Sequence, residues 1–226
     1  MDVVPPTFAS SPRPAPEPEV QREVLYVADP LCTWCWGFAP VSNELARAVA
    51  GRASVRVVAG GLASNPTAPL HPGEVSAMLD EWHRVHDATG QAFDFDHPVD
   101  TATVYDSGPA CRALALMGRL HAECALAYLH ALQRAFFAQR RDVGSNAVLA
   151  AVAGECGIAV AEFTRALSSA EADEAFNADL MLSQALNLRS FPSVALRHDQ
   201  RYALLTVGYH PWSQLAPYVQ GWLEHE

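Results

Sequence analysis

Cys32-Thr33-Trp34-Cys35 is the stretch that decides the fold, because it stands where a strand should end and a helix begin. Upstream, residues 23–28 form a short apolar run rich in β-formers, closed by Asp29-Pro30. Downstream, residues 41–49 repeat apolar side chains at helical spacing. We therefore predict a strand, a tight turn and a helix whose first turn carries both thiols.

Two cysteines separated by two residues at a helix N-terminus are typical of a redox-active dithiol. The free backbone N–H groups and the positive end of the helix dipole favour the thiolate of the first cysteine, Cys32. Such placement lowers a cysteine pKa from about 8.5 to roughly 3.5–7.5. Cys35 lies one turn further on and points inward. We expect Cys32 to be the exposed thiol and Cys35 the buried one.

The composition excludes several classes of partner. Of the 226 residues, 50% are hydrophobic and 18% are charged, and the net charge is −10. An acidic chain without a Lys/Arg-rich run lacks the basic surface on which nucleic acids and anionic membranes bind. No stretch approaches the ~18 apolar residues of a membrane span. We expect a cytoplasmic protein, with the proline-rich residues 1–21 as a disordered tail and not a secretory signal.

The cysteine count indicates that the paired cysteines have a chemical role. Five cysteines are an odd number and too few for a disulfide framework at this length. A zinc site would need a second close pair, yet Cys111, Cys124 and Cys156 lie far apart in the sequence. We expect these three thiols to behave as small buried hydrophobes. We expect no bound metal and no resident cofactor.

The rest of the pattern predicts an α/β fold interrupted by helices. Residues 54–59 form a second strand, so the chain starts with a parallel βαβ unit. Helical spacing then fills about half the chain, with Ser107 as the expected N-cap of one helix. Strands return at 192–196 and 202–207 as an antiparallel hairpin, and a final helix follows. We assign residues 22–61 and 189–226 to one domain of order βαβ…ββα, and residues 62–188 to an inserted all-helical domain.

This order, together with three short motifs, resembles the DsbA family of thiol–disulfide oxidoreductases, and within it the cytoplasmic FrnE-like branch. The motifs are residues 29–38, Ser107-Gly108-Pro109-Ala110 and Phe191-Pro192-Ser193. The likeness covers the chain from about residue 23 to its C-terminus. It implies a thioredoxin-like fold with a large helical insertion.

The resemblance implies a role for each matching residue. Cys32 corresponds to the attacking cysteine of the family and Cys35 to its resolving cysteine. Pro192 corresponds to the cis-proline beside the dithiol, where Phe191 offers main-chain hydrogen bonds to an incoming chain. The alternative for Pro192 is an ordinary proline at the start of a strand. Trp34, between the cysteines, is expected to form an apolar surface for substrates.

One position departs from the family pattern. Many thioredoxin-like enzymes carry a buried acid six residues before the attacking cysteine, and here that position is Tyr26. The usual proton acceptor for the resolving thiol is therefore absent. Asp29 is our candidate for that role, acting directly or through water. Its alternative role is that of a turn residue before Pro30.

Other candidates have simpler explanations. His83 and His86 share a predicted helix face without further ligands nearby, which is typical of a solvated surface and not of a metal site. Trp36 is expected to pack in the core at the start of the first helix. Arg189 either lowers the pKa of a nearby thiol or is a surface charge, and we favour the surface charge.

The leading hypothesis is a dithiol oxidoreductase that acts through a mixed disulfide on protein or small-molecule thiols and disulfides. The alternative is a glutathione-dependent isomerase or transferase, with glutathione as co-substrate, because kappa-class glutathione transferases and chromene-carboxylate isomerases resemble this architecture. Those relatives typically carry a serine at the attacking position, so the pair Cys32 and Cys35 favours exchange. A redox-inactive binding module is the third hypothesis. Neither the direction of exchange, the physiological substrate nor the oligomeric state follows from the residues.

Overall fold

The computed structural model describes residues 22–62, 70–96 and 105–224. The predicted disordered tail, residues 1–21, lies outside the described residues. The elements follow one another as β1 (Arg22–Ala28), α1 (Thr33–Gly37), α2 (Ala39–Val49), β2 (Ser54–Ala59), α3 (Pro72–Thr89), α4 (Gly108–Leu120), the 3-10 turn η1 (Ala122–Cys124), α5 (Ala125–Phe137), α6 (Asn146–Glu155), α7 (Val160–Leu167), α8 (Ala170–Ala185), β3 (Ser193–His198), β4 (Arg201–Val207) and α9 (Trp212–Glu224). The predicted α/β order is confirmed, while the domain boundaries stay a prediction.

The described residues form a four-stranded mixed sheet in the order β2-β1-β3-β4. Strands β1 and β2 are parallel, with Val27 opposite Val58, as the predicted βαβ unit requires. Strand β3 runs antiparallel to β1, with Val27 opposite Ser193. Strands β3 and β4 form the predicted antiparallel hairpin. The carboxyl end of β1 therefore lies beside the start of β3, at one end of the two central strands.

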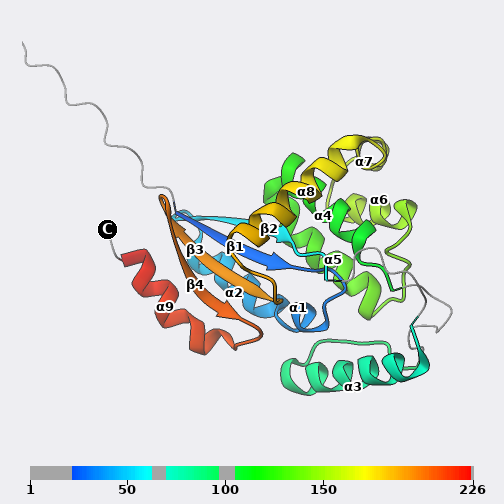
Figure 1. The fold of residues 1–226 in the computed structure, drawn as a ribbon, viewed down its shortest axis with the longest axis horizontal. Helices are drawn as coiled ribbons and strands as arrows, with labels where there is room; N and C mark the ends of the chain where they lie inside the picture. The colour runs from blue at the N-terminus through cyan, green and yellow to red at the C-terminus, as the bar shows by residue number, and fades with distance from the viewer. Residues whose placement is uncertain (1–21, 63–69, 97–104, 225–226) are drawn as a thin grey trace, which may run out of the picture.

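Strand β1 is buried on both faces, which explains its nearly continuous apolar sequence. Val24, Tyr26 and Ala28 point into the main core, to which α2, α4, α5 and α9 also contribute. Leu25 and Val27 point to a smaller cluster on the other face. Figure 1 shows α2 behind the sheet and α8 crossing in front of it. The strand that leads to the thiols is thus fixed from both sides.

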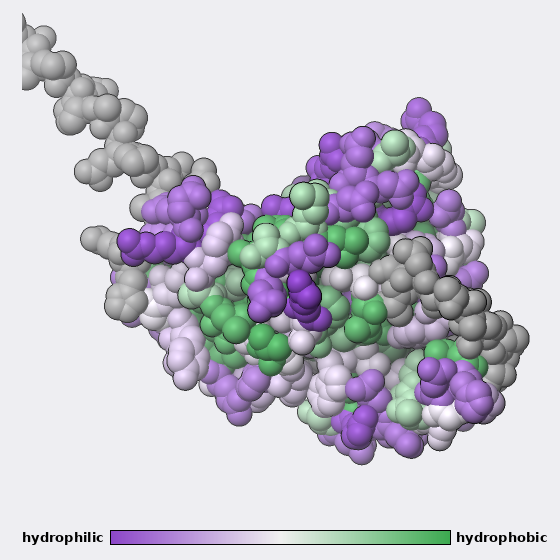
Figure 2. Space-filling model, viewed as in Figure 1, coloured by the Kyte–Doolittle hydropathy of each residue, from purple (hydrophilic) through white to green (hydrophobic). Residues whose placement is uncertain are grey.

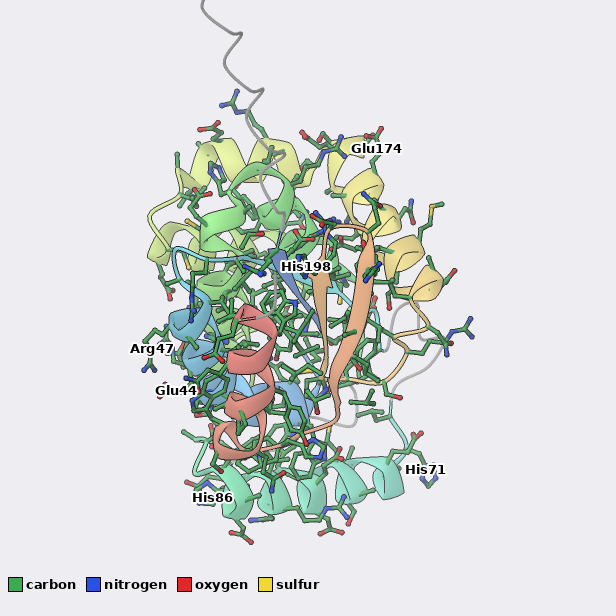
Figure 3. All side chains as sticks on the ribbon, turned by 90° about the vertical axis from the view of Figure 1, so that its left-hand side faces the viewer. Glu44, Arg47, His71, His86, Glu174 and His198 are labelled. Carbon is green, nitrogen blue, oxygen red and sulfur yellow. The ribbon has the colours of Figure 1, made fainter. Side chains whose placement is uncertain are left out.

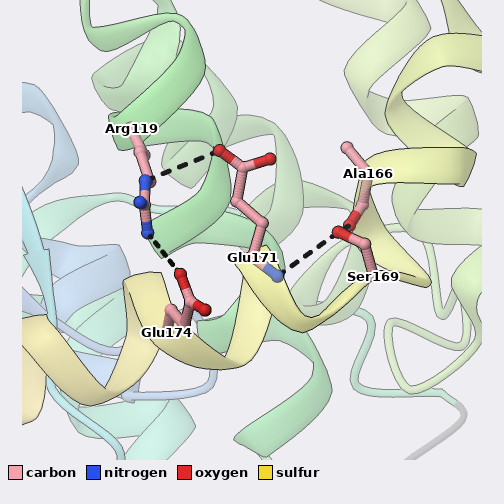
Figure 4. A network of polar contacts seen from close by, with 5 residues as sticks. All are labelled: Arg119, Ala166, Ser169, Glu171 and Glu174. Carbon is pink, nitrogen blue, oxygen red and sulfur yellow. Dashed lines mark hydrogen bonds and ion pairs between the residues drawn. The ribbon is translucent and has the colours of Figure 1, made fainter.

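A network of charged and polar side chains joins α4 to α8. Arg119 on α4 lies 3.5 Å from Glu171 and 3.5 Å from Glu174 on α8 (Figure 4). Ser169 caps α8, accepting a hydrogen bond from the Glu171 backbone N–H at 3.3 Å and donating one to the Ala166 carbonyl. These contacts join α4 to α8, and both helices also pack against the edge strand β2.

The outer helices carry mostly polar side chains on the face that Figure 2 shows. Figure 2 shows hydrophilic residues over the outer helices, with hydrophobic residues gathered toward the middle of the visible face. None of the described helices has the length and apolar character that crossing a membrane requires.

Candidate active site

Cys32 occupies the position before the first residue of α1. Its Sγ accepts a hydrogen bond from the Cys35 backbone N–H at 3.3 Å, so the sulfur itself caps the helix. The Cys32 backbone N–H donates to the Asp29 carbonyl at 3.1 Å, which closes the turn that follows β1. The local sequence therefore holds the first sulfur against the open end of a helix.

The single helix predicted after the cysteines is divided in the structure. Helix α1 ends at Gly37, Phe38 lies between the two helices, and α2 starts at Ala39 with Pro40 in its first turn. Proline has no N–H to donate, and its ring would clash with the carbonyl four residues earlier in a continuous helix. Pro40 is tolerated only because a new helix starts there.

Both thiols are buried, which corrects the expectation of an exposed Cys32. Cys32 is 6% exposed and Cys35 is 0% exposed. Tyr105 covers the turn, donating a hydrogen bond from its hydroxyl to the Leu31 carbonyl. Burial, followed by the hydrogen bond and charge of Cys32, raises the pKa of Cys35 well above its ordinary value. All five cysteines are free thiols in the structure.

Tyr26 occupies the position of the buried acid but does not act as a proton acceptor. Its side chain is 1% exposed, and its hydroxyl lies 3.5 Å from the Cys35 carbonyl oxygen. Burial and the nearby thiols raise its pKa well above 10, so the phenol stays neutral near pH 7. A neutral phenol with so high a pKa does not accept a proton from a thiol.

Asp29 is fully buried and accepts hydrogen bonds from residues far apart in the sequence. Its Oδ1 accepts from the Leu31 backbone N–H at 2.8 Å, which is the contact of a turn residue. Its Oδ2 accepts from the Leu62 backbone N–H at 2.6 Å, the Ser107 hydroxyl at 2.8 Å and the Cys111 thiol at 3.2 Å. Burial raises its pKa, while the four hydrogen bonds oppose that shift.

The partners of Asp29 correct one prediction and add two residues to the site. Ser107 precedes α4, but its side chain makes no capping bond and donates to Asp29 instead. A hydrogen bond from the Ser107 hydroxyl to a buried carboxylate is charge-assisted and is therefore stronger than a capping hydrogen bond from a backbone N–H. This difference explains why Ser107 contacts Asp29 and does not cap α4. Cys111, expected to be only a small hydrophobe, is 0% exposed and joins the same carboxylate. The spacing of 107 and 111, one helical turn, places both side chains on one helix face but gives no sign of Asp29.

Trp34 and Trp36 leave α1 in different directions. The Trp34 indole N–H donates to Glu81 Oε1 on α3 at 3.1 Å, and its ring lies 5.8 Å from that of Tyr209. Trp36 is 7% exposed and stacks on Phe137 at a centroid distance of 6.4 Å. Trp36 therefore packs in the core as expected, and Trp34 forms a half-buried wall beside the thiols.

Phe191 and Pro192 precede β3, at the same end of the central strands as the thiols. Ser193 pairs with Val27, two residues before Asp29, so Pro192 stands beside the end of β1. The Phe191–Pro192 peptide bond is cis. The Phe191 ring packs on Gly60, where an added Cβ would come within 2.4 Å of it. The topology thus brings together the two segments that the resemblance connects.

The remaining candidates contribute no metal site. His83 stacks on Phe95 at 4.2 Å, and His86 meets the edge of the same ring at 5.6 Å. Across the described ranges, no group of three His, Cys, Asp or Glu side chains is placed to hold a metal ion. Arg189 is exposed, which agrees with a surface charge.

A family model described as thioredoxin matches residues 25–213. The chain belongs to the thioredoxin family. Among solved structures, a candidate protein disulfide isomerase from Nitrosomonas europaea is 31% identical, with a TM-score of 0.84 over 90% of this chain and 98% of that one. The predicted resemblance to DsbA-family oxidoreductases is thereby confirmed.

A second thioredoxin-family match is the cytosolic disulfide reductase DsbM from Pseudomonas aeruginosa. It is 28% identical, with a TM-score of 0.73 over 89% of this chain and 98% of that one. Its structure with GSH matches over 90% of this chain and 100% of that one, with 27% identity and a TM-score of 0.72. The structural neighbours support a redox enzyme in general.

The curated proteins that match this sequence are described as adapter proteins and not as oxidoreductases. The ClpXP adapter protein SpxH of Bacillus subtilis is 21% identical over 187 residues, which is 81% of this chain and 60% of that protein. The same protein of Bacillus licheniformis is 23% identical over 186 residues, 81% of this chain and 60% of that protein. This chain therefore spans about 60% of the length of these relatives.

Proposed function

We propose that this protein is a cytoplasmic, DsbA-like thiol–disulfide oxidoreductase that acts through Cys32 and Cys35. The observation that carries the proposal is the position of Cys32 at the start of α1, where its sulfur accepts a hydrogen bond from the Cys35 backbone N–H. A hydrogen bond from a backbone N–H favours negative charge on sulfur, and the thiolate is the nucleophile in disulfide exchange. The cytosolic location of DsbM supports the cytoplasmic assignment.

The proposed reduction of a substrate proceeds in two exchanges. The Cys32 thiolate attacks one sulfur of the substrate disulfide, forming a mixed disulfide as the substrate S–S bond breaks, and the released thiolate takes up a proton. Cys35 then loses its proton and attacks Cys32, which forms the Cys32–Cys35 disulfide and releases the second substrate thiol. Two electrons pass from the enzyme to the substrate. Oxidation of a substrate follows the same steps in reverse.

The neighbouring residues divide the remaining tasks. Asp29 is the proposed proton acceptor for Cys35, because it lies close enough to act on that thiol: a hydrogen bond with the Asp29 backbone lowers the Cys35 pKa, and the Asp29 charge raises it. A carboxylate destabilised by burial gains from taking the proton. Trp34 and Phe191 are the proposed substrate-binding surface, with Pro192 holding the backbone beside the thiols.

Small-molecule thiols are the proposed partners that recycle the enzyme. DsbM is the relevant relative, because it is described as a disulfide reductase and its structure with GSH also matches this chain. Glutathione would reduce the Cys32–Cys35 disulfide by two further exchanges and leave as glutathione disulfide. Glutathione is therefore a co-substrate in this proposal.

Single substitutions separate exchange from glutathione transfer. We expect Cys32→Ser to abolish reduction of a model protein disulfide, since the attacking thiol is lost and the remaining thiol, Cys35, is fully buried with a raised pKa. We expect Cys35→Ser to accumulate a covalent mixed disulfide, visible by mass spectrometry, because attack proceeds without resolution. Conjugation of glutathione to a small electrophile is measured in parallel on the same proteins. Conjugation unaffected by either substitution, with no exchange in the wild type, would instead assign the protein to the isomerase or transferase class.

A further inference from the structure

A cavity of about 450 Å³ lies beside the α1–α2 junction, apart from the contacts that surround Asp29. It is bounded by α2, α5, the start of α9 and Gln91. Its apolar lining includes Trp36, Val41 and Trp212. A volume of this size is typical of a pocket for a small organic molecule. The buried Trp36 contributes little of this surface and the half-buried Trp212 more, and aromatic lining suits a flat ligand.

His130 presents a hydrogen-bond acceptor in this cavity. The Ser42 hydroxyl donates its single hydrogen to the Ala39 carbonyl at 2.9 Å. The Ser42 oxygen also lies 2.9 Å from His130 Nε2, and with the hydroxyl hydrogen on the Ala39 carbonyl we assign Nε2–H as the donor of this second bond. Burial, with the nearby Arg134 charge, lowers the His130 pKa to about 4, so the ring is neutral at pH 7. Nδ1 therefore carries a lone pair that can accept a hydrogen bond.

The cavity also carries a positive charge without a matching carboxylate. Arg47 pairs with Glu44 on the same helix at 2.9 Å, and Figure 3 places both side chains together on the outer side of α2. Arg134 also lines the cavity, and in the described part of the chain no carboxylate lies within ion-pairing distance of it. On a protein of net charge −10, this is a local site for an anion.

We propose that this cavity binds a small aromatic carboxylate that also bears a hydroxyl or amine hydrogen. The ring lies between Trp36 and Trp212, the carboxylate pairs with Arg134, and the ligand donor reaches His130 Nδ1. An arginine fits a carboxylate with two parallel N–H bonds, which gives the site its preference for that group. The site is separate from disulfide exchange, so neither proposal depends on the other.

The probe for this site is 6-hydroxy-2-naphthoate, a fluorescent carboxylate with a distant hydroxyl. At pH 7 we expect it to bind the full-length wild type, with at least tenfold weaker binding to Arg134→Gln and to His130→Gln. Arg140→Gln, on a residue beyond the end of the same helix, is the control and should bind as the wild type does. We expect 2-naphthol, which lacks the carboxylate, to bind equally to wild type and Arg134→Gln.

Two readouts keep the experiment decisive. The circular dichroism and thermal midpoint of each variant show that it folds, and NMR of histidine-labelled protein locates the bound probe at His130. Absence of wild-type binding up to millimolar probe would overturn the proposal. Equal binding by wild type and Arg134→Gln would overturn it as well. Full exchange activity in Arg134→Gln is expected, because that residue has no part in the dithiol chemistry.

Discussion

At the scale of single residues, Asp29 links the chemistry to the fold. Its carboxylate collects hydrogen bonds from the turn after β1, the segment after β2 and the start of α4. A fully buried carboxylate is costly unless its lone pairs are satisfied, and here four donors satisfy them. The same burial raises its pKa, which suits the proton acceptor that we propose it to be.

Replacing this carboxylate should slow resolution of the mixed disulfide. In Asp29→Asn the neutral amide accepts no proton from Cys35, and we expect resolution at pH 7 to slow by about 10²-fold, as for loss of a general base. The rate should recover as the pH rises and hydroxide replaces the missing base. The measurement is the single-turnover decay of the mixed disulfide between pH 6 and 9.

The control for this prediction is Asp106→Asn. Asp106 Oδ1 accepts from the Gly108 backbone N–H at 2.8 Å in the same segment, but it does not contact Asp29. We expect it to cost stability only. If Asp29→Asn also lost stability while each folded molecule resolved the intermediate at the wild-type rate and pH profile, Asp29 would be a turn residue alone.

At the scale of elements, α3 approaches closely the helix α1 that carries the thiols. Figure 1 shows α3 lying beside α1, away from the rest of the helical region. Gly37 makes this approach possible, because a Cβ there would lie 2.8 Å from Val85 Cγ1 and 3.1 Å from Thr89 Cγ2. A side chain at position 37 would push α3 away from the dithiol.

Gly37→Ala should therefore destabilise the protein, although Gly→Ala in a helix normally stabilises it by up to about 1 kcal/mol. We expect a loss of about 1–3 kcal/mol from overpacking, measured by urea unfolding. Gly118→Ala on α4 is the matched control, since its new Cβ would meet only the Val57 carbonyl oxygen at 3.8 Å. That variant should be as stable as the wild type or more so. An equal increase in the free energy of unfolding for both substitutions would show that α3 can move away from position 37 without loss of stability.

The sequence predicted elements well and their long-range contacts poorly. Apolar periodicity is a local property, so the strand at 54–59 was found from neighbouring residues, and the strand predicted at 192–196 lies at 193–198 in the structure. The break at Phe38 is also local, because Pro40 lies in the first turn of α2, but the prediction of a single helix rested on the spacing of residues 41–49 alone. A proline in the first turn of a helix marks its start, so Pro40 is a local signal for the second helix.

At the scale of the whole molecule, the missed features are those that need the fold. Cys32 and Cys35 were found because their spacing is itself the signal. Nothing near Ser107 or Cys111 in the sequence points to Asp29, which lies 78 and 82 residues away. The burial of Cys32 has the same origin, since Tyr105 reaches Leu31 from 74 residues away. Such contacts follow only once the sheet and the helical region are placed together.

His130 offers a test of one such long-range contact, because it joins α5 to Ser42 on α2 across 88 residues of sequence. Its pKa is about 4 in the folded protein against 6.5 for an unperturbed histidine. As the pH falls from 6.5 to 4, the unfolded chain takes up a proton that the folded protein does not. Stability is therefore lost across this window and is unaffected by His130 above it.

We expect the urea midpoint of the wild type to fall more steeply between pH 7 and 4.5 than that of His130→Gln. At pH 7 both side chains are neutral, so the difference between the two proteins there measures only the altered contact with Ser42. The additional difference in urea midpoint that develops on acidification measures the stability lost because His130 binds a proton in the unfolded chain and not in the folded protein. Carboxylates titrating in the same window contribute equally to both proteins and cancel in the comparison. Parallel curves would mean that His130 is accessible and protonates freely, so the packing of α5 on α2 would be looser than the hydrogen bond to Ser42 implies.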